Sequence, residues 1–138
     1  MLEVQVKHLG DVQFEVKARQ HTIYCDQPTD NGGYDEGMTP PELLLGSVGA
    51  CAGHYAVQYM KIKNLPTAGL QIRVTGEKAT NPGRVSDIGI EVTYPAVLTP
   101  KDREGVLAAI HKCMIHNTLQ NPPKMHVEFA DVQMPVAA

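Results

Sequence analysis

Hydrophobic and polar residues alternate along the first part of the chain, as they do in strands with one buried face. Apolar side chains recur with a period of two over residues 2–6 and again over residues 12–16, with a turn between them. This pattern predicts an antiparallel hairpin with one core face. A third strand is expected over residues 20–26. Residues 28–37 are rich in acidic and turn-forming residues, so we expect an exposed loop there.

A helical pattern follows from Thr39 to Lys63. Thr39 is a suitable N-cap, Pro40 fits the first helical turn, and Glu42 completes a capping box. No proline interrupts the rest of this stretch, so we expect a helix of about 24 residues and roughly 36 Å. Its centre, around Cys51, is rich in glycine, alanine and serine. Because small side chains let another backbone approach closely, the helix should be central and packed on more than one side.

The second half of the chain repeats these signals. Residues 70–74 and 88–92 alternate on either side of an Asn-Pro-Gly turn, which predicts a second hairpin. The pair Thr99-Pro100 opens a second helix, and residues 125–129 alternate as a last strand. Helical spacing assigns one apolar face of the second helix to Val106, Leu107, Ile110, Cys113 and Met114. We therefore expect one domain over residues 1–138, of the α+β class, with antiparallel sheets and a long central helix.

Composition excludes several classes of protein. The 12 Lys+Arg residues nearly balance the 15 Asp+Glu residues without a long run of either sign, which argues against nucleic acid and membrane surfaces as partners. The sequence has no apolar stretch of about 20 residues and no signal-peptide pattern, so we expect a cytoplasmic protein. Three cysteines do not suit a secreted disulfide framework. One of them, Cys25, is expected to be a half-buried strand residue.

Each of the other two cysteines is followed three residues later by a histidine, as Cys51 with His54 and Cys113 with His116. Residues three apart in a helix share a face. Three interpretations are open from the residues alone. The thiols are small apolar core residues; or the imidazoles activate them as nucleophilic thiolates; or two cysteines and two histidines form a tetrahedral metal site.

The segment from Thr39 to Cys51, TPPELLLGSVGAC, resembles the P-x-E-L-L segment and following cysteine of the OsmC/Ohr family of thiol peroxidases. Cys113, in a late helix, matches the second cysteine of that family, and the order of elements fits over essentially the whole chain. The resemblance implies an OsmC-like fold and an intertwined homodimer with active sites at the subunit interface. The sequence is more similar to OsmC-like members such as the YhfA type than to a standard Ohr.

The resemblance also implies an activity, which is reduction of organic hydroperoxides in oxidative-stress defence without a cofactor or metal. A thiolate cleaves the O–O bond, and the resulting sulfenic acid condenses with the second thiol. A dithiol or lipoyl-type reductant then restores both cysteines. By position, Cys51 corresponds to the peroxidatic thiol and Cys113 to the resolving one. Glu42 matches the family glutamate that helps to hold a thiolate-stabilising arginine.

The family arginine has no counterpart in the loop after the first strand, which reads HLGD over residues 8–11. The nearest arginine is Arg19, displaced toward the next strand. Because an uncompensated thiolate in an apolar site is costly, His54 and His116 are the candidates to replace it. Two alternatives to a peroxidase remain: a non-enzymatic dimer that binds a small apolar molecule between its long helices, and a Cys/His metal site.

Overall fold

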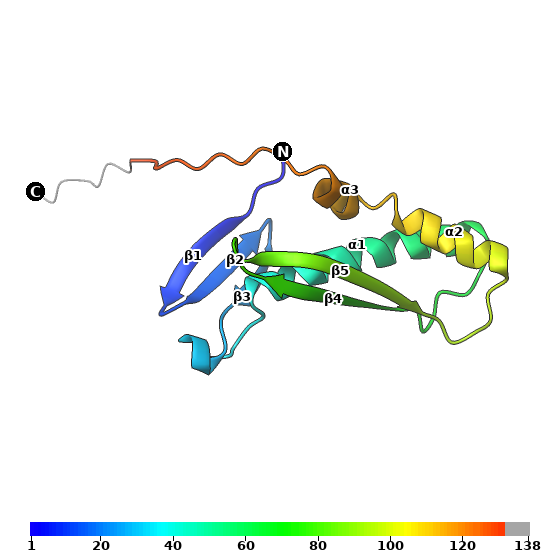
Figure 1. The fold of residues 1–138 in the computed structure, drawn as a ribbon, viewed down its shortest axis with the longest axis horizontal. Helices are drawn as coiled ribbons and strands as arrows, with labels where there is room; N and C mark the ends of the chain where they lie inside the picture. The colour runs from blue at the N-terminus through cyan, green and yellow to red at the C-terminus, as the bar shows by residue number, and fades with distance from the viewer. Residues whose placement is uncertain (132–138) are drawn as a thin grey trace, which may run out of the picture.

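The computed structural model describes residues 1–131, which form two small antiparallel sheets and three α-helices (Figure 1). The elements in chain order are β1 (Gln5–Gly10), β2 (Gln13–Ala18), β3 (His21–Cys25), the 3-10 helix η1 (Thr29–Asn31), α1 (Pro40–Ile62), β4 (Gln71–Ala79), β5 (Arg84–Thr93), α2 (Pro100–Ile110) and α3 (Met114–Gln120). This is the predicted α+β architecture. None of the described helices is both long and apolar enough to cross a membrane.

The first sheet has the order β1-β2-β3, and all of its strands are antiparallel. The predicted hairpin and third strand are therefore confirmed. The predicted burial of one face is wrong for the first strand region, because Leu2, Val4 and Val6 keep 92%, 57% and 61% of their surface exposed. The physical reason is visible in Figure 1, where this sheet lies at one end of the molecule and the long helix does not cover it.

Helix α1 begins with the predicted capping box. The backbone N–H of Glu42 donates to Thr39 Oγ1 over 3.4 Å, and the backbone N–H of Thr39 donates to Glu42 Oε2 over 2.7 Å. The helix packs against β4 and β5 on one side and against α2 and α3 on another. Its central position, packed on more than one side, is thus confirmed. Its fully buried residues are Val48, Ala52, Ala56 and Met60.

The glycines of α1 divide between a packed face and an open face. A Cβ at Gly49 would lie 3.0 Å from a methyl carbon of Val74, and one at Gly53 would lie 3.5 Å from Ile72. These two glycines therefore let α1 approach β4 of the same chain. At Gly46, in contrast, no atom lies within 4 Å of a Cβ position. The open face of α1 around it is formed by Gly46, Ser47, Ala50, His54 and Gln58.

Strands β4 and β5 form the predicted second hairpin, with Val74 paired to Ile90 near its centre. Their apolar side chains and those of α2 meet α1 in the main core. That core contains Ala52, Ala56, Met60, Val106 and Ile110, with partly buried neighbours that include Ile72, Ile90 and Val92. The hairpin and α2 thus hold the middle of α1 between them.

The second helix begins as predicted but ends early. Thr99 Oγ1 accepts the backbone N–H of Asp102 over 3.1 Å as the helix cap. Helix α2 stops at Ile110, the chain turns over residues 111–113, and a separate helix begins at Met114. Cys113 closes this turn, because its backbone N–H donates to the carbonyl of Ile110 over 3.0 Å.

This break changes the predicted apolar face. Val106, Ile110 and Cys113 are buried, as expected. The prediction is wrong at Leu107 and Met114, whose side chains are 48% and 63% exposed. The turn redirects the residues that follow Ile110, which accounts for Met114. Leu107 lies within α2, at the edge of the stripe formed by the buried residues Val106 and Ile110.

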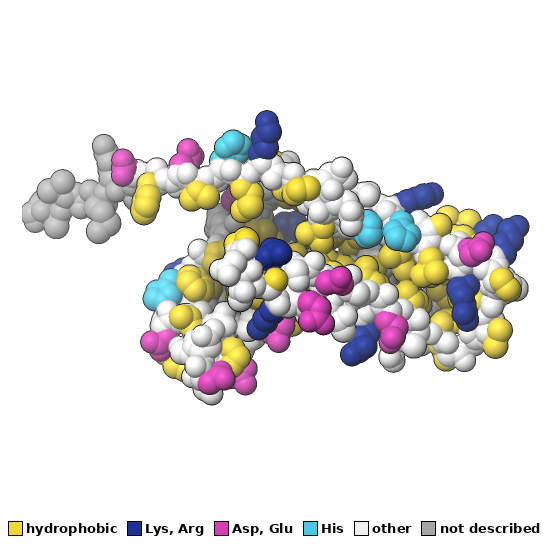
Figure 2. Space-filling model, in the orientation of Figure 1, with side chains coloured by type: hydrophobic (Ala, Val, Ile, Leu, Met, Phe, Trp, Pro, Cys, Tyr) yellow, Lys and Arg dark blue, Asp and Glu magenta, His cyan; other side chains and the backbone are white. Residues whose placement is uncertain are grey.

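The predicted last strand over residues 125–129 is also wrong for the single chain. Residues 122–131 form no strand, and Met125, Val127 and Phe129 are 86%, 95% and 100% exposed. In Figure 1 this segment runs away from the body of the molecule, past the N-terminus. Figure 2 shows a row of hydrophobic side chains along it. An alternating segment becomes a strand only where it meets a strand edge, and the described chain offers none there.

Candidate active site

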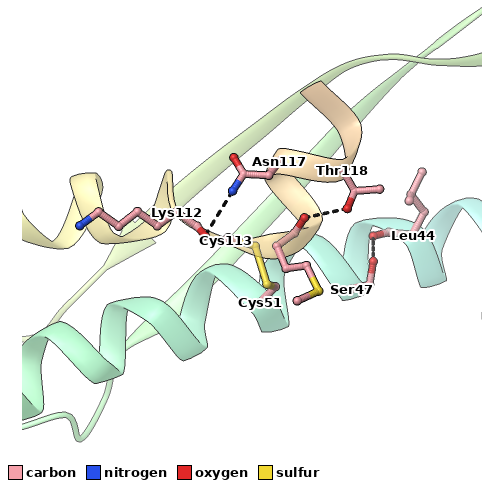
Figure 3. Close-up of a disulfide and its surroundings, with 8 residues drawn as sticks. Leu44, Ser47, Cys51, Lys112, Cys113, Asn117 and Thr118 are labelled. Carbon is pink, nitrogen blue, oxygen red and sulfur yellow. Dashed lines mark hydrogen bonds between the residues drawn. A yellow bond between two sulfur atoms is a disulfide. The ribbon is translucent and has the colours of Figure 1, made fainter. Parts of the chain in front are cut away.

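The fold brings together the two cysteines that the sequence analysis selected. Cys51 and Cys113 are 62 residues apart in the chain, yet their Cα atoms are 5.9 Å apart and their sulfur atoms are joined as a disulfide (Figure 3). The Cα separation lies in the usual range for disulfides. Cys113 is only 1% exposed, whereas Cys51 is half-buried. Of the two cysteines, Cys51 is therefore the more exposed residue.

Packing of α2 on α1 produces this encounter. The hydroxyl of Tyr59 on α1 donates to Asp102 Oδ1 on α2 over 3.2 Å. The ring of Tyr59 occupies the space that a side chain at position 105 would need, so Gly105 allows the two helices to come close. Val106 and Ile110 then enter the core, and the turn that follows delivers Cys113 to α1. The pair of thiols thus depends on tertiary packing and not on local spacing.

The two candidate histidines lie near the cysteines in the chain, but each ring packs against another ring. His54 is exposed on the open face of α1, with its ring centroid 5.5 Å from that of Tyr55. The His116 ring stands edge-on to the ring of His111, with the centroids 5.1 Å apart. Cys113 is the N-cap of α3, so His116 occupies the third position of that helix.

The structure places Arg19 and Glu42 away from Cys51 within one chain. Arg19 is exposed in the turn between β2 and β3, where its φ is +55°. Glu42 lies nine residues before Cys51 on α1, which corresponds to about 14 Å along the helix axis. Hydrogen bonds from the Thr39 backbone and hydroxyl hold the pKa of the Glu42 carboxyl below its ordinary value, and nearby Lys78 acts in the same direction.

A buried polar centre next to β3 has no counterpart in the sequence analysis. Cys25, predicted to be half-buried, is 6% exposed and unpaired, and burial together with the neighbouring Asp26 charge raises the pKa of its thiol. The Asp26 side chain is completely buried. The only sequence signal for it is an aspartate at the end of a strand before a turn-rich loop. It accepts four hydrogen bonds, from the backbone N–H groups of Gln27, Tyr34 and Glu36 and from the Gln13 side-chain amide.

These hydrogen bonds decide the charge of Asp26. Burial alone would raise the pKa of its carboxyl, but the four donors favour the ionised form and lower the pKa overall. The ionised carboxylate therefore fixes the loop between β3 and α1. Its role in the structure is to position the start of α1, and no catalytic contact is required to explain it.

A shallow hollow lies beside the disulfide. Its volume is about 450 Å³, and its lining residues are Tyr55, Lys112, Met114, Asn117, Thr118 and Asn121. Tyr55 follows Cys51 by one turn of α1, and Lys112 and Met114 are the chain neighbours of Cys113. The Asn117 amide donates to the Lys112 carbonyl over 3.4 Å and the Thr118 hydroxyl donates to the Met114 carbonyl over 2.8 Å (Figure 3). Sequence reasoning missed this hollow, because its residues have no common motif.

The geometry argues against the metal-site interpretation. The two cysteine sulfurs bind each other. Within residues 1–131 no group of three or more His, Cys, Asp or Glu side chains is arranged to hold a metal ion. The chemistry that the site supports best is therefore thiol–disulfide chemistry.

Comparison with known proteins agrees with this class of site. The family model described as OsmC-like protein matches residues 33–128, and the chain belongs to this family. No curated protein sequence matches it significantly.

Solved structures show the same fold. A protein of Psychrobacter arcticus 273-4, named for osmotic stress and detoxification response, is 26% identical, with a TM-score of 0.79 over 86% of this chain and 88% of its own. An OsmC-like protein of Mycoplasma pneumoniae is 23% identical, with a TM-score of 0.70 over 88% and 89%. The organic hydroperoxide resistance protein OhrB of Bacillus subtilis is 18% identical, with a TM-score of 0.59 over 88% and 92%.

Proposed function

We propose that this protein is a cytoplasmic, thiol-dependent reductase of organic hydroperoxides that acts in oxidative-stress defence through a two-cysteine mechanism. The observation that carries the proposal is the contact between Cys51 and Cys113, which are 62 residues apart in the chain; Cys51 is half-buried and Cys113 is buried. The names of similar solved proteins support it, since those of Bacillus subtilis and Legionella pneumophila are called organic hydroperoxide resistance proteins.

The proposed reaction begins at Cys51, because it is the more exposed of the two cysteines. The Cys51 thiolate attacks the terminal oxygen of the hydroperoxide, the O–O bond breaks, and the alkoxide leaves as an alcohol after taking a proton. Cys51 is then a sulfenic acid. The Cys113 sulfur attacks it, water leaves, and the disulfide forms. A dithiol reductant then reduces the disulfide by two exchange steps and is itself oxidised to a disulfide.

Stabilisation of the Cys51 thiolate is assigned to the histidines in this proposal. Arg19 is exposed on a sheet that does not pack on α1, so it is the weaker candidate within one chain. His54 follows Cys51 by three residues on the same helix, and His116 lies at the start of α3. Only the protonated imidazole stabilises a thiolate by charge. Glu42, the carboxylate of the helix cap, would orient whichever cation approaches the site from a second copy of the chain.

A homodimer is part of the same proposal. Three features of the single chain are incomplete without a partner: the open face of α1, the exposed side of the β1–β3 sheet, and the alternating apolar segment over residues 125–129. A second copy would cover all three at once by packing α1 on α1 and by supplying a strand edge for the segment. Exposed apolar surface of this kind marks interaction sites.

The direct test is loss of cumene hydroperoxide in the presence of purified protein and dihydrolipoamide. Wild type and Cys25→Ser should consume the peroxide at similar rates, because Cys25 is buried and outside the proposed mechanism. Cys51→Ser should be inactive. Cys113→Ser should trap a sulfenic acid on Cys51, which a dimedone probe followed by mass spectrometry detects. Wild-type protein that leaves the peroxide unconsumed would favour a non-enzymatic dimer with a ligand between its helices.

A further inference from the structure

Helix α3 is joined to the folded core at one end. Its N-cap, Cys113, is 1% exposed and is bonded to Cys51 on α1 (Figure 3). The helix itself has no buried residue, and Met114 and Leu119 are 63% and 43% exposed. A helix of seven residues is too short to be stable alone in water, so α3 depends on the contacts that hold it in place.

The polar contacts of α3 are local. The Asn117 amide donates to the Lys112 carbonyl, and the Thr118 hydroxyl donates to a backbone carbonyl one turn earlier in the same helix. The ring of His116 stands edge-on to the ring of His111 at the end of α2. Within residues 1–131, no side-chain hydrogen bond joins α3 to α1 or to the β4–β5 hairpin. The disulfide is therefore the strongest link between α3 and α1.

The two longer helices beside the disulfide are anchored much more firmly than α3. Ala52 and Ala56 fix α1 in the main core, and Val106 and Ile110 fix α2 there. When a disulfide is reduced, its two sulfur atoms must separate from bonding distance to van der Waals contact. Cys113 is almost completely enclosed, so a neighbouring element has to move to make this space. Helix α3 is the neighbour with the fewest contacts to lose.

We propose that the Cys51–Cys113 disulfide is a redox-operated latch, which holds α3 against α1 when it is oxidised and releases α3 when it is reduced. Oxidation removes two electrons and two protons from the thiols as the S–S bond forms, and a hydroperoxide or diamide accepts them. A dithiol returns them and is itself oxidised to a disulfide. Because residues 122–131 follow α3 in the chain, release of α3 also frees the start of this exposed segment. The latch does not require peroxidase activity, since any oxidant that forms the disulfide closes it.

Amide hydrogen exchange followed by NMR tests the latch without any hydroperoxide. Full-length Cys25→Ser protein, in which no third thiol can react, is compared after diamide and after dithiothreitol. Reduction should speed exchange at residues 117–121 by about tenfold or more, because the short helix loses its support. The nuclear Overhauser effect between the ring protons of His111 and His116 should disappear at the same time. Equal exchange rates at residues 117–121 in the two redox states would overturn the proposal.

A second measurement separates release of α3 from a loss of stability in the whole domain. Exchange in the reduced protein is repeated at several low concentrations of urea. Local release exposes little surface, so the rates at residues 117–121 should hardly change with urea. The amide of Ile110, in the core part of α2, should exchange faster as urea rises. The same urea dependence at both places would mean that α3 opens only when the domain unfolds, and would overturn the latch.

Cys51→Ser in the same Cys25→Ser background is the matched variant, because it keeps Cys113 and α3 unchanged but cannot form the bond. Without any oxidant, its residues 117–121 should exchange as fast as those of the reduced parent. Slow exchange in this variant, at the rate of the oxidised parent, would show that packing alone holds α3 on α1 and that the disulfide is not the latch.

Discussion

Replacing Gly105 with alanine tests the packing that delivers Cys113 to Cys51. Helix propensity alone predicts that this change stabilises α2 by about 1 kcal/mol. The structure predicts the opposite sign, because a Cβ at Gly105 would overlap the ring and hydroxyl of Tyr59. The ring cannot turn aside freely, since its hydroxyl is hydrogen-bonded to Asp102 and the ring packs against the core.

The magnitude follows from these opposing effects. Overpacking of this kind costs typically about 1–3 kcal/mol, and the hydrogen bond to Asp102, if broken, accounts for about 1 kcal/mol of that cost. After the gain in helix propensity, the free energy of unfolding of Gly105→Ala should fall by up to about 2 kcal/mol. The measurement is urea unfolding followed by circular dichroism, with the protein kept reduced.

Two further variants separate packing from propensity. Ala108→Gly, at an exposed position of the same helix, should cost about 1 kcal/mol and calibrates the propensity of α2. In a Tyr59→Ala background the overlap is gone, so Gly105→Ala should become stabilising. If Gly105→Ala stabilises the otherwise unchanged protein by the full propensity gain, the close contact between α1 and α2 is refuted.

Three other predictions concern the buried carboxylate of Asp26, the homodimer and the Cys51 thiol. Asp26→Asn should lower the melting temperature by several degrees at pH 7 and by less below about pH 4. The pKa of the Asp26 carboxyl is lower in the folded state than in the unfolded state, so its stabilisation is present above the unfolded-state pKa near 3.9 and is lost as pH falls through the folded-state pKa. An equal loss at both pH values would contradict this. Gly46→Leu should fold in the single chain, where its Cβ meets no atom, but should shift sedimentation from dimer to monomer; an unchanged dimer would exclude this face. His54→Gln or His116→Gln should raise the pH midpoint of Cys51 alkylation by about one unit if the charge interaction is about 1.4 kcal/mol, and unchanged profiles would make both histidines bystanders.

The sequence predicts the parts of the fold whose information is local. The capping box at Thr39 and Glu42 and the period of two in both hairpins arise from neighbouring residues, so each appears in the structure near its expected place. The break between α2 and α3 was not predictable in this way. Residues 106–114 have helical spacing throughout, and the turn at 111–113 is set by the packing of Cys113 against α1.

The residues of the candidate site also differ in whether the local sequence identifies them. Motif and element order selected Cys51 and Cys113, and the structure joins them. Asp26 gave no comparable signal, because its four donors come from residue 13 of β2 and from loop residues 27, 34 and 36, which meet only in the folded chain. The strand expected over residues 125–129 failed for a related reason, since alternation states that a segment can pair but not with which edge.

The disulfide encloses more of the molecule than the site itself. The chain between Cys51 and Cys113 includes the end of α1, the β4–β5 hairpin and all of α2, so oxidation closes a ring around most of the core. In the chain-entropy model, a ring of this length restricts the unfolded state enough to stabilise the fold by about 4 kcal/mol. Each oxidation would therefore make the whole domain harder to unfold and to digest, and each reduction would reverse it. Resistance to a protease should then report the redox state of the protein, even when no substrate is being consumed.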